Sequence, residues 1–179
     1  MKKLLSAEQV KRALDRLQKA VLAELPEDSR IAVVGIRTRG ETLAQRIVQY
    51  LQANRPGLRV DHGVLDITFY RDDLSRRRGA PLVRATEIDF DLDDAWVLLV
   101  DDVLQTGRSV RAALDALHDF GRPRFVRLAV LIDRGGRELP IAADFVGQPV
   151  KVPQGQRVQV KLQENDGEEG VFSIQKHAG

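Results

Sequence analysis

The sequence predicts an α/β fold, in which a doubly wound, mostly parallel sheet flanked by helices carries a small C-terminal strand-rich hood. Three observations support this prediction. Short apolar runs alternate with segments of helical periodicity through the first two thirds of the chain. One of these runs, Val97 to Val100, leads directly into two carboxylates and a short loop. The last third contains only shorter candidate strands.

The first half of the chain is predicted to alternate between helices and strands. Residues 6–9 form a capping box, and apolar residues recur with helical period after it. Pro56 and Gly57 mark the end of a second helix. The predicted elements are a helix over 10–25, a strand over 31–36, a helix over 43–51, a strand near 58–61 and another over 64–70.

The second half begins with a highly charged loop over 71–79, which lacks apolar anchors, and an acidic connector over 91–94. Gly121 and Pro123 provide the stop signal for the one long helix that follows. The predicted elements are strands over 95–100 and 125–132, a helix over 110–120 between them, and short strands over 142–146, 157–162 and 171–174. We expect a single domain over 1–179, with the hood formed mainly by 140–179.

Composition narrows the class of protein. The chain has 179 residues, enough for one domain with a full core. Its formal net charge is +2, so any basic binding surface must be local. The absence of cysteine excludes disulfides, thiol catalysis and zinc–thiolate sites. Apolar runs are too short to span a membrane or to form a signal peptide, so we expect a cytoplasmic enzyme without a membrane partner.

The most informative residues are Asp101 and Asp102, which follow the apolar run at the expected carboxyl end of a buried strand. Adjacent acids point in different directions, which suits two neighbouring ribose hydroxyls better than a shared proton. Carboxylates accept hydrogen bonds from hydroxyls and help to hold Mg²⁺, directly or through water. These two residues therefore predict a site for a polyol and a metal ion.

The loop after the acids suits a phosphate. Residues 105–109 offer successive backbone N–H groups, and Thr106 and Ser109 add hydroxyl donors. Gly107 allows close approach, and a helix beginning near Arg108 presents its positive end. The alternative is an Asp-rich turn before a capped helix. The chain contains neither a P-loop nor a dinucleotide-binding glycine motif. A second basic loop, Arg37 to Gly40, also lies between a strand and a helix and predicts another anion site.

These motifs resemble those of type I phosphoribosyltransferases. Within that superfamily, segments spread over nearly the whole chain are similar to the bifunctional pyrimidine operon regulatory protein and uracil phosphoribosyltransferase family. The matching segments are 34–40, 65–74, 128–134, 137–141 and 143–147. The resemblance implies the type I phosphoribosyltransferase fold and Mg²⁺-dependent conversion of uracil and phosphoribosyl diphosphate to UMP and diphosphate. It also implies a homodimer or a higher homo-oligomer.

The resemblance further implies residue roles. Asp101, Asp102 and Arg39 are expected to be catalytic, and the two acids to hold the metal directly, through phosphoribosyl diphosphate or through water. A flexible lid is expected at about 71–80, where Arg71 lies in a matched segment and Arg76, Arg77 and Arg78 follow. The expected substrate-binding residues are Arg37, Thr38, Arg39, Gly40, Arg71, Asp101, Asp102, Val103, Leu104, Gln105, Thr106, Gly107, Arg108, Ser109, Asp133 and Arg134.

The family's second role is to bind pyrimidine operon (pyr) leader mRNA, with pyrimidine nucleotides controlling transcription attenuation. Basic residues of the first helix are candidates for RNA contact, namely Arg12, Arg16 and Lys19. Asp15, Gly136 and Gln105 depart from residues common in the family, which weakens the RNA role more than the enzymatic one. Two alternatives stay open: an RNA-binding attenuation regulator with weak catalysis, and a phosphoribosyltransferase for another base, such as a purine or orotate.

Overall fold

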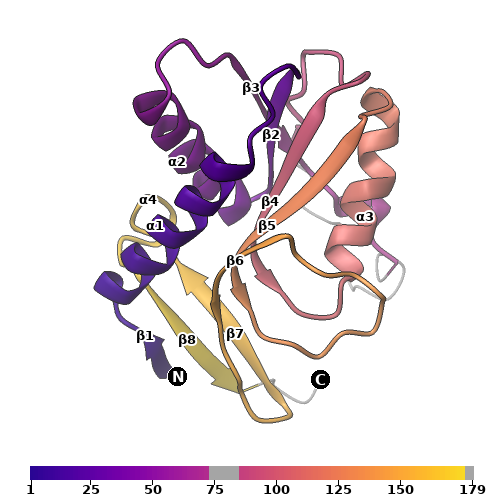
Figure 1. Ribbon diagram of the computed structural model, residues 1–179. Coiled ribbons are helices and arrows are strands. Elements are labelled where there is room, and N and C mark those ends of the chain that lie inside the picture. Colours follow the sequence, from indigo (N-terminus) through magenta and orange to yellow (C-terminus); the bar gives the residue numbers. More distant parts are fainter. Residues whose placement is uncertain (73–84, 176–179) are drawn as a thin grey trace.

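The computed structural model describes residues 1–72 and 85–175, which form two sheets (Figure 1). The larger sheet has five parallel strands in the order β3-β2-β4-β5-β6. Its strands are β2 (Ile31–Ile36), β3 (Val60–Leu65), β4 (Trp96–Leu104), β5 (Phe125–Asp133) and β6 (Phe145–Pro149). The smaller sheet is antiparallel in the order β1-β8-β7, formed by β1 (Lys2–Leu5), β7 (Gln156–Lys161) and β8 (Gly170–Gln175).

Helices cover both faces of the larger sheet. Figure 1 shows α1 (Ala7–Glu24) and α2 (Arg39–Asn54) on one side and α3 (Arg108–Leu117) on the other. Alternate residues of β4 enter two separate cores: Leu98 packs towards α1 and α2, and Leu99 packs towards α3. This arrangement confirms the predicted doubly wound α/β fold.

Local sequence signals explain where the first helix begins. The Ser6 side chain accepts a hydrogen bond from the Gln9 N–H (3.3 Å), and the Gln9 side chain accepts one from the Ser6 N–H (2.8 Å). Both halves of the predicted capping box are therefore present. No helix of the described residues has the length and apolar character that crossing a membrane requires.

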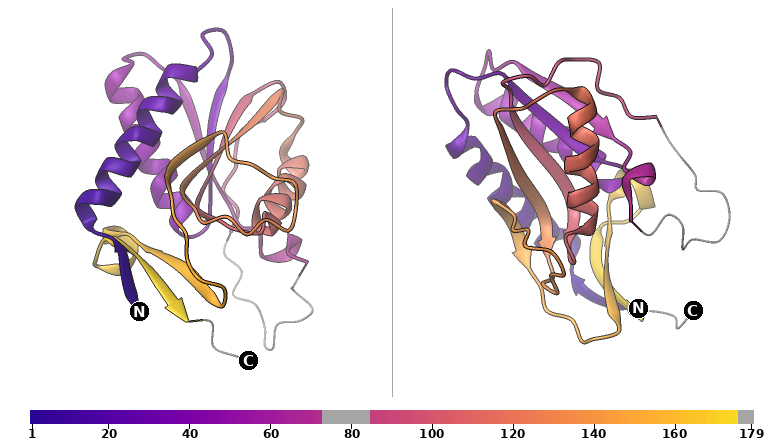
Figure 2. Two further views of the ribbon diagram at one scale, coloured as in Figure 1. Left: turned by 60° about the horizontal axis from the view of Figure 1, so that its bottom comes forward. Right: turned by 90° about the vertical axis from the view of Figure 1, so that its right-hand side faces the viewer.

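The sheet order places the functional loops together. Strand β4 lies between β2 and β5, and all three run in the same direction, so their carboxyl ends share one edge of the sheet. The smaller sheet lies beside that edge, and β7 contacts β4. The left-hand view of Figure 2 brings the smaller sheet forward. Loops 37–40 and 105–109 therefore open towards the hood.

Several predicted boundaries are wrong. The two strands expected near 58–61 and over 64–70 are the single strand β3, followed by a 3-10 turn over Thr68–Tyr70. The Asp66 carboxylate accepts the Thr68 N–H (2.8 Å), which favours a turn over continued extension. The strand expected over 142–146 begins only at Phe145. Strand β4 continues to Leu104, so both acids lie inside the strand rather than beyond its end.

The hood is also assembled differently from the prediction. Strand β6 lies in the range assigned to the hood but belongs to the larger sheet. The N-terminal strand β1 pairs with β8 instead, and a short helix, α4 (Gln163–Asp166), lies between β7 and β8. Neither β1 nor α4 was expected. Both are four residues long, too short for a periodic pattern, and β1 is held by pairing with a distant segment.

We expect Gly35→Ala to destabilise the fold. A Cβ at Gly35 would lie 2.4 Å from the Gly40 carbonyl oxygen and 2.6 Å from the Glu41 Cα, so α2 would have to move away from β2. Overpacking costs about 1–3 kcal/mol, and each kcal/mol lowers the melting temperature of such a domain by about 2–4 °C. Thermal unfolding measures the effect. Ala142→Ser, which adds one atom at an exposed position, is the control. Equal melting temperatures would contradict this packing.

Candidate active site

Asp101 and Asp102 lie in the C-terminal half of β4. Asp101 is 9% exposed and lines a cavity next to loop 105–109. Asp102 lies close enough to Arg39 for the positive charge of the guanidinium to lower the pKa of its carboxyl group. Each acid also accepts a backbone N–H from the next residue, at 2.9 Å for Asp101 and 2.8 Å for Asp102. The two carboxyl groups also interact with each other, because a hydrogen bond between the Asp101 and Asp102 side chains contributes to the pKa shift of each.

The environment of both carboxyl groups favours protonation. Burial, together with the neighbouring charge of Asp102, raises the pKa of Asp101 well above its usual value. Burial also raises the pKa of Asp102, although the positive charge of Arg39 opposes this effect. Buried acids with perturbed pKa values at the mouth of a cavity are typical of functional sites. A ligand that supplies hydroxyl donors or positive charge would favour their ionised forms.

Loop 105–109 has the geometry of an anion site. Gly107 has φ = +91°, a left-handed conformation that favours glycine, and α3 begins at the next residue. The Thr106 hydroxyl accepts the Arg108 N–H (3.2 Å). The Thr106 carbonyl accepts the N–H groups of Glu138 and Leu139, both at 3.0 Å. The segment after β5 thereby holds the loop in place.

The cavity beside this loop has a volume of about 260 Å³. Arg71 and Asp101 line it, together with the predicted residues Gln105, Thr106, Gly107 and Ser109. Two hood residues of β7, Arg157 and Val158, also line it, and the sequence did not indicate either of them. Only the folding of the hood over the sheet edge brings β7 to the loop. A single basic residue in a short strand carries no pattern that reveals this position.

The two arginines of segment 37–40 have different surroundings, because Arg37 precedes α2 whereas Arg39 is its first residue. The Arg39 guanidinium contacts Asp166 of α4 (2.6 Å) and acts on Asp102. The Arg37 guanidinium instead pairs with Glu41 and Glu87, both at 2.9 Å, so it ties β2 to the segment that begins at residue 85. The Arg37–Thr38 peptide bond is cis. Arg39 is therefore the arginine of this loop that faces the acids of β4.

Gly40 brings loop 37–40 against β4. A Cβ there would lie 2.5 Å from the Val100 carbonyl oxygen, so only glycine permits the observed contact. The candidate diphosphate loop and the acidic strand are thus in backbone contact. This proximity could not be read from residues that are 60 positions apart in the sequence.

The segment after β5 is organised by an ion pair. The Asp133 carboxylate accepts two hydrogen bonds from the Arg137 guanidinium, at 2.6 and 3.0 Å. This pairing lowers the pKa of Asp133, so its side chain is ionised and engaged with Arg137. The Arg134 N–H donates to the Leu104 carbonyl oxygen (3.1 Å), and its buried Nε has no hydrogen-bond partner among the described residues. The backbone around Asp133 therefore reaches the end of β4.

Of the remaining predicted residues, Val103 and Leu104 also line the cavity beside loop 105–109. The Arg108 side chain contacts Asp72 (2.5 Å) and Glu138 (2.8 Å), which leaves its backbone to the phosphate loop. Most of the expected lid, including Arg76, Arg77 and Arg78, lies outside the described residues.

The candidate RNA-binding cations of α1 all have partners. Arg12 pairs with Glu8 (2.5 Å) and Lys19 with Asp15 (2.8 Å). Arg16 donates to the Gly147 carbonyl oxygen (3.0 Å) and to the Gln148 side chain (2.6 Å), so it ties α1 to β6. Exposed i,i+4 pairs contribute only about 0.3–0.5 kcal/mol, so Arg12 and Lys19 can exchange their partners for phosphates at little cost.

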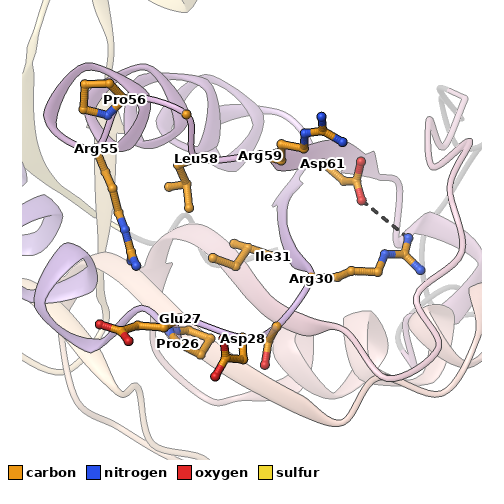
Figure 3. A pocket seen from close by; sticks show the side chains of 12 residues that line it. Pro26, Glu27, Asp28, Arg30, Ile31, Arg55, Pro56, Leu58, Arg59 and Asp61 are labelled. Carbon is orange, nitrogen blue, oxygen red and sulfur yellow. Dashed lines mark ion pairs between the residues drawn. The ribbon is translucent and has the colours of Figure 1, made fainter.

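A larger cavity, of about 740 Å³, lies at the opposite edge of the sheet, where β2 and β3 begin (Figure 3). Arg30 and Asp61 pair across its side at 3.5 Å. Its charged residues balance, with three arginines (Arg30, Arg55 and Arg59) and three acids (Glu27, Asp28 and Asp61). It contains none of the predicted site residues. The smaller cavity at the carboxyl edge is therefore the candidate active site.

The donor set suits a metal ion that is shared with a ligand. The described residues contain no cluster of three or more His, Cys, Asp or Glu side chains able to hold a metal. Asp101 and Asp102 provide two carboxylates, and Mg²⁺ commonly binds to one or two carboxylates together with substrate phosphates and water. The site therefore fits Mg²⁺ that arrives with a phosphate-containing ligand.

Comparisons with known proteins show the family and the fold of the chain. Residues 1–165 match the family model of the phosphoribosyl transferase domain. The chain is 49% identical to the bifunctional protein PyrR of Deinococcus radiodurans, over 92% of this chain and 89% of the relative. It is 51% identical to the bifunctional protein PyrR of Roseiflexus sp., over 99% and 97% of the two chains. The hypoxanthine phosphoribosyltransferase of Trypanosoma cruzi has the same fold (TM-score 0.71, 16% identity, 98% and 97% covered).

We expect Asp101→Asn to stabilise the fold above about pH 4, because the amide removes a buried charge and keeps the acceptor for the Asp102 N–H. The folded-state pKa of Asp101 lies above its unfolded value of about 3.9, so the wild-type protein loses stability as pH rises between the two values. The melting temperature of the variant should therefore exceed that of the wild-type protein by an increment that grows with pH. An increment that shrinks as pH rises would contradict this expectation.

Proposed function

The chain belongs to the phosphoribosyltransferase domain family and, within it, to the bifunctional PyrR proteins, and on this basis we propose that it is a uracil phosphoribosyltransferase. The reaction joins uracil and phosphoribosyl diphosphate to give UMP and diphosphate. One observation carries the proposal. The acids of β4 open on one side to phosphate loop 105–109 and on the other to Arg39 of loop 37–40.

The proposed mechanism assigns a role to each part of this site. Asp101 and Asp102 accept hydrogen bonds from the two ribose hydroxyls, and the N–H groups of loop 105–109 bind the 5-phosphate. Uracil N1 forms the new bond to ribose C1 as the bond from C1 to the diphosphate oxygen breaks, and the N1 proton is released. Positive charge develops on the ribose ring, as in other glycosyl transfers, and the nearby carboxylates stabilise it. Arg39 stabilises the departing diphosphate.

Phosphoribosyltransferases generally use Mg²⁺, and we propose the same cofactor for this chain. Asp101 and Asp102 would hold the ion, directly or through water and phosphoribosyl diphosphate. When bound, Mg²⁺ neutralises charge on the diphosphate. The protein's own contribution is to orient the ribose, to exclude water beneath the hood and to bind the base near Asp133 and Arg134, where backbone groups can recognise a flat pyrimidine.

The word "bifunctional" in the names of the relatives favours a second function. We propose that the chain also binds pyr leader mRNA in response to pyrimidine nucleotides, acting in the cytoplasm as a homodimer or higher homo-oligomer. Arg12, Arg16 and Lys19 are the proposed RNA contacts, with Arg16 partly occupied by β6. A regulator with weak catalysis and a transferase for another base remain the alternatives.

The enzyme proposal predicts diphosphate release from phosphoribosyl diphosphate only when uracil and Mg²⁺ are present. Hypoxanthine, guanine and orotate serve as competing bases in the same assay. A transferase for a different base would be revealed by product formation with that base. Absence of product with uracil would refute the proposed activity.

We expect Asp102→Asn to lower kcat/KM by roughly 10²–10³-fold, the size of loss typical when one charge-stabilising group is removed. The amide keeps the shape of the side chain but removes the charge that faces Arg39 and the ribose. Steady-state kinetics measure the loss. Asp115→Asn, which changes an exposed acid on α3, is the matched control and should leave kinetics unchanged. Wild-type kinetics in the Asp102 variant would contradict the assignment.

The RNA proposal predicts that UMP increases binding to the pyr leader RNA of the same genome in a gel-shift assay at low salt. The double variant Arg12→Glu and Lys19→Glu reverses the charge of two proposed RNA contacts. It should bind the RNA more weakly and with a smaller dependence on salt. Lys2→Glu, on β1 rather than α1, is the control. Failure of UMP to increase binding would refute the regulatory role.

A further inference from the structure

The short helix α4 of the hood makes three separate polar contacts with α2, and Figure 1 shows the two helices side by side. Glu164 pairs with Arg46 (2.6 Å), and Asn165 accepts a hydrogen bond from the Thr42 hydroxyl (2.8 Å). The third contact joins Asp166 to Arg39. The first two residues contact only the body of α2, whereas the third contacts the arginine of the proposed diphosphate loop.

The contact between Asp166 and Arg39 has two points. The Arg39 Nε–H donates to Asp166 Oδ2 (3.1 Å), and an Nη2–H donates to Oδ1 (2.6 Å). Asp166 Oδ2 also accepts the Leu162 N–H (2.9 Å), which fixes the carboxylate to the start of α4. The Arg39 side chain is only 27% exposed and the Asp166 side chain only 16%. This pairing lowers the pKa of Asp166 below its ordinary value, so its carboxylate is ionised at neutral pH.

A guanidinium carries five N–H donors in a planar fork. The pair with Asp166 uses the edge formed by Nε and Nη2, so both donors on Nη1 lie outside this pair. Asp102 lies near enough to Arg39 to act on it electrostatically, but the guanidinium donates its two hydrogen bonds to Asp166. If Asp166 lost its charge, Arg39 would lose the ion pair that fixes its Nε–Nη2 edge.

We propose that Asp166 is a positioning residue, which holds Arg39 by one edge of its guanidinium so that the Nη1 edge is presented to the diphosphate. This inference rests on the proposed transferase function. It extends the functional site into the hood and gives α4 a specific role. Asp166 acts through Arg39 and does not touch the reacting atoms.

The test compares Asp166→Asn with Glu164→Gln. Both changes neutralise an acid of α4, but only the first removes the negative charge that faces Arg39. For Asp166→Asn we expect the KM for phosphoribosyl diphosphate and the Kd for diphosphate to rise about tenfold, with the KM for uracil changed less than twofold. Glu164→Gln should leave all three values within twofold of the wild-type protein. Asp166→Glu keeps the charge and should restore much of the affinity for diphosphate.

A purely structural role for Asp166 makes a different prediction. In that case, both neutralising variants would lower the melting temperature and change the kinetics for both substrates alike. Unchanged diphosphate affinity in Asp166→Asn, or an equal loss in Glu164→Gln, would overturn the inference. If Asp166→Asn does not fold, Asp166→Gln is compared with Asp166→Glu, which has the same length, and only the neutral variant should raise the diphosphate Kd about tenfold without changing the KM for uracil.

Calorimetric titration with diphosphate separates this inference from the proposed function. Wild-type protein that binds diphosphate but forms no UMP would refute uracil transfer and leave the Asp166 comparison intact. Wild-type protein that binds no diphosphate would overturn the inference itself. In an Arg39→Gln background, Asp166→Asn should have no further effect on the diphosphate Kd, because the two residues act as one unit.

Discussion

The burial of two adjacent carboxyl groups inside β4 is the constraint on which the site depends. Asp101 lies in a strand whose preceding residues are fully buried, so its charge is poorly solvated. Asp101 lines the cavity beside the phosphate loop, and Asp102 lies near Arg39. Because the two carboxyl groups also hydrogen-bond to each other, the buried pair connects the two sides of the site.

This arrangement separates the requirements of folding from those of ligand binding. Without a ligand, burial favours the neutral form of both acids. The proposed role needs the ionised form, because a carboxylate accepts hydrogen bonds through both oxygens. A ligand with hydroxyl groups and an accompanying cation would relieve that condition, so part of the cost of burying the acids is recovered only on binding. Glycines at positions 35 and 40 make the arrangement compact, because Gly35 allows the start of α2 to lie against β2 and Gly40 allows it to lie against β4.

The sequence predicted the central features because they depend on local patterns. The run from Val97 to Ser109 combines apolar periodicity, paired acids and a glycine turn within one strand–loop–helix unit, and the structure contains that unit. The capping box of α1 is also local and was found correctly. The errors concern elements held by distant contacts. Strand β1 exists through pairing with β8, and the position of Arg157 depends on the hood folding over the sheet edge.

The hood illustrates why a site can include residues without any sequence signal. Strand β1 precedes α1, while β7, α4 and β8 follow the last strand of the larger sheet, so both ends of the described chain meet beside the catalytic edge. The ion pairs of Arg46 with Glu164 and Glu169 anchor this layer to α2. Asp166 of the same layer pairs with Arg39, the first residue of α2. Through this pair the hood reaches the segment that faces Asp102, although it is remote from that segment in the sequence.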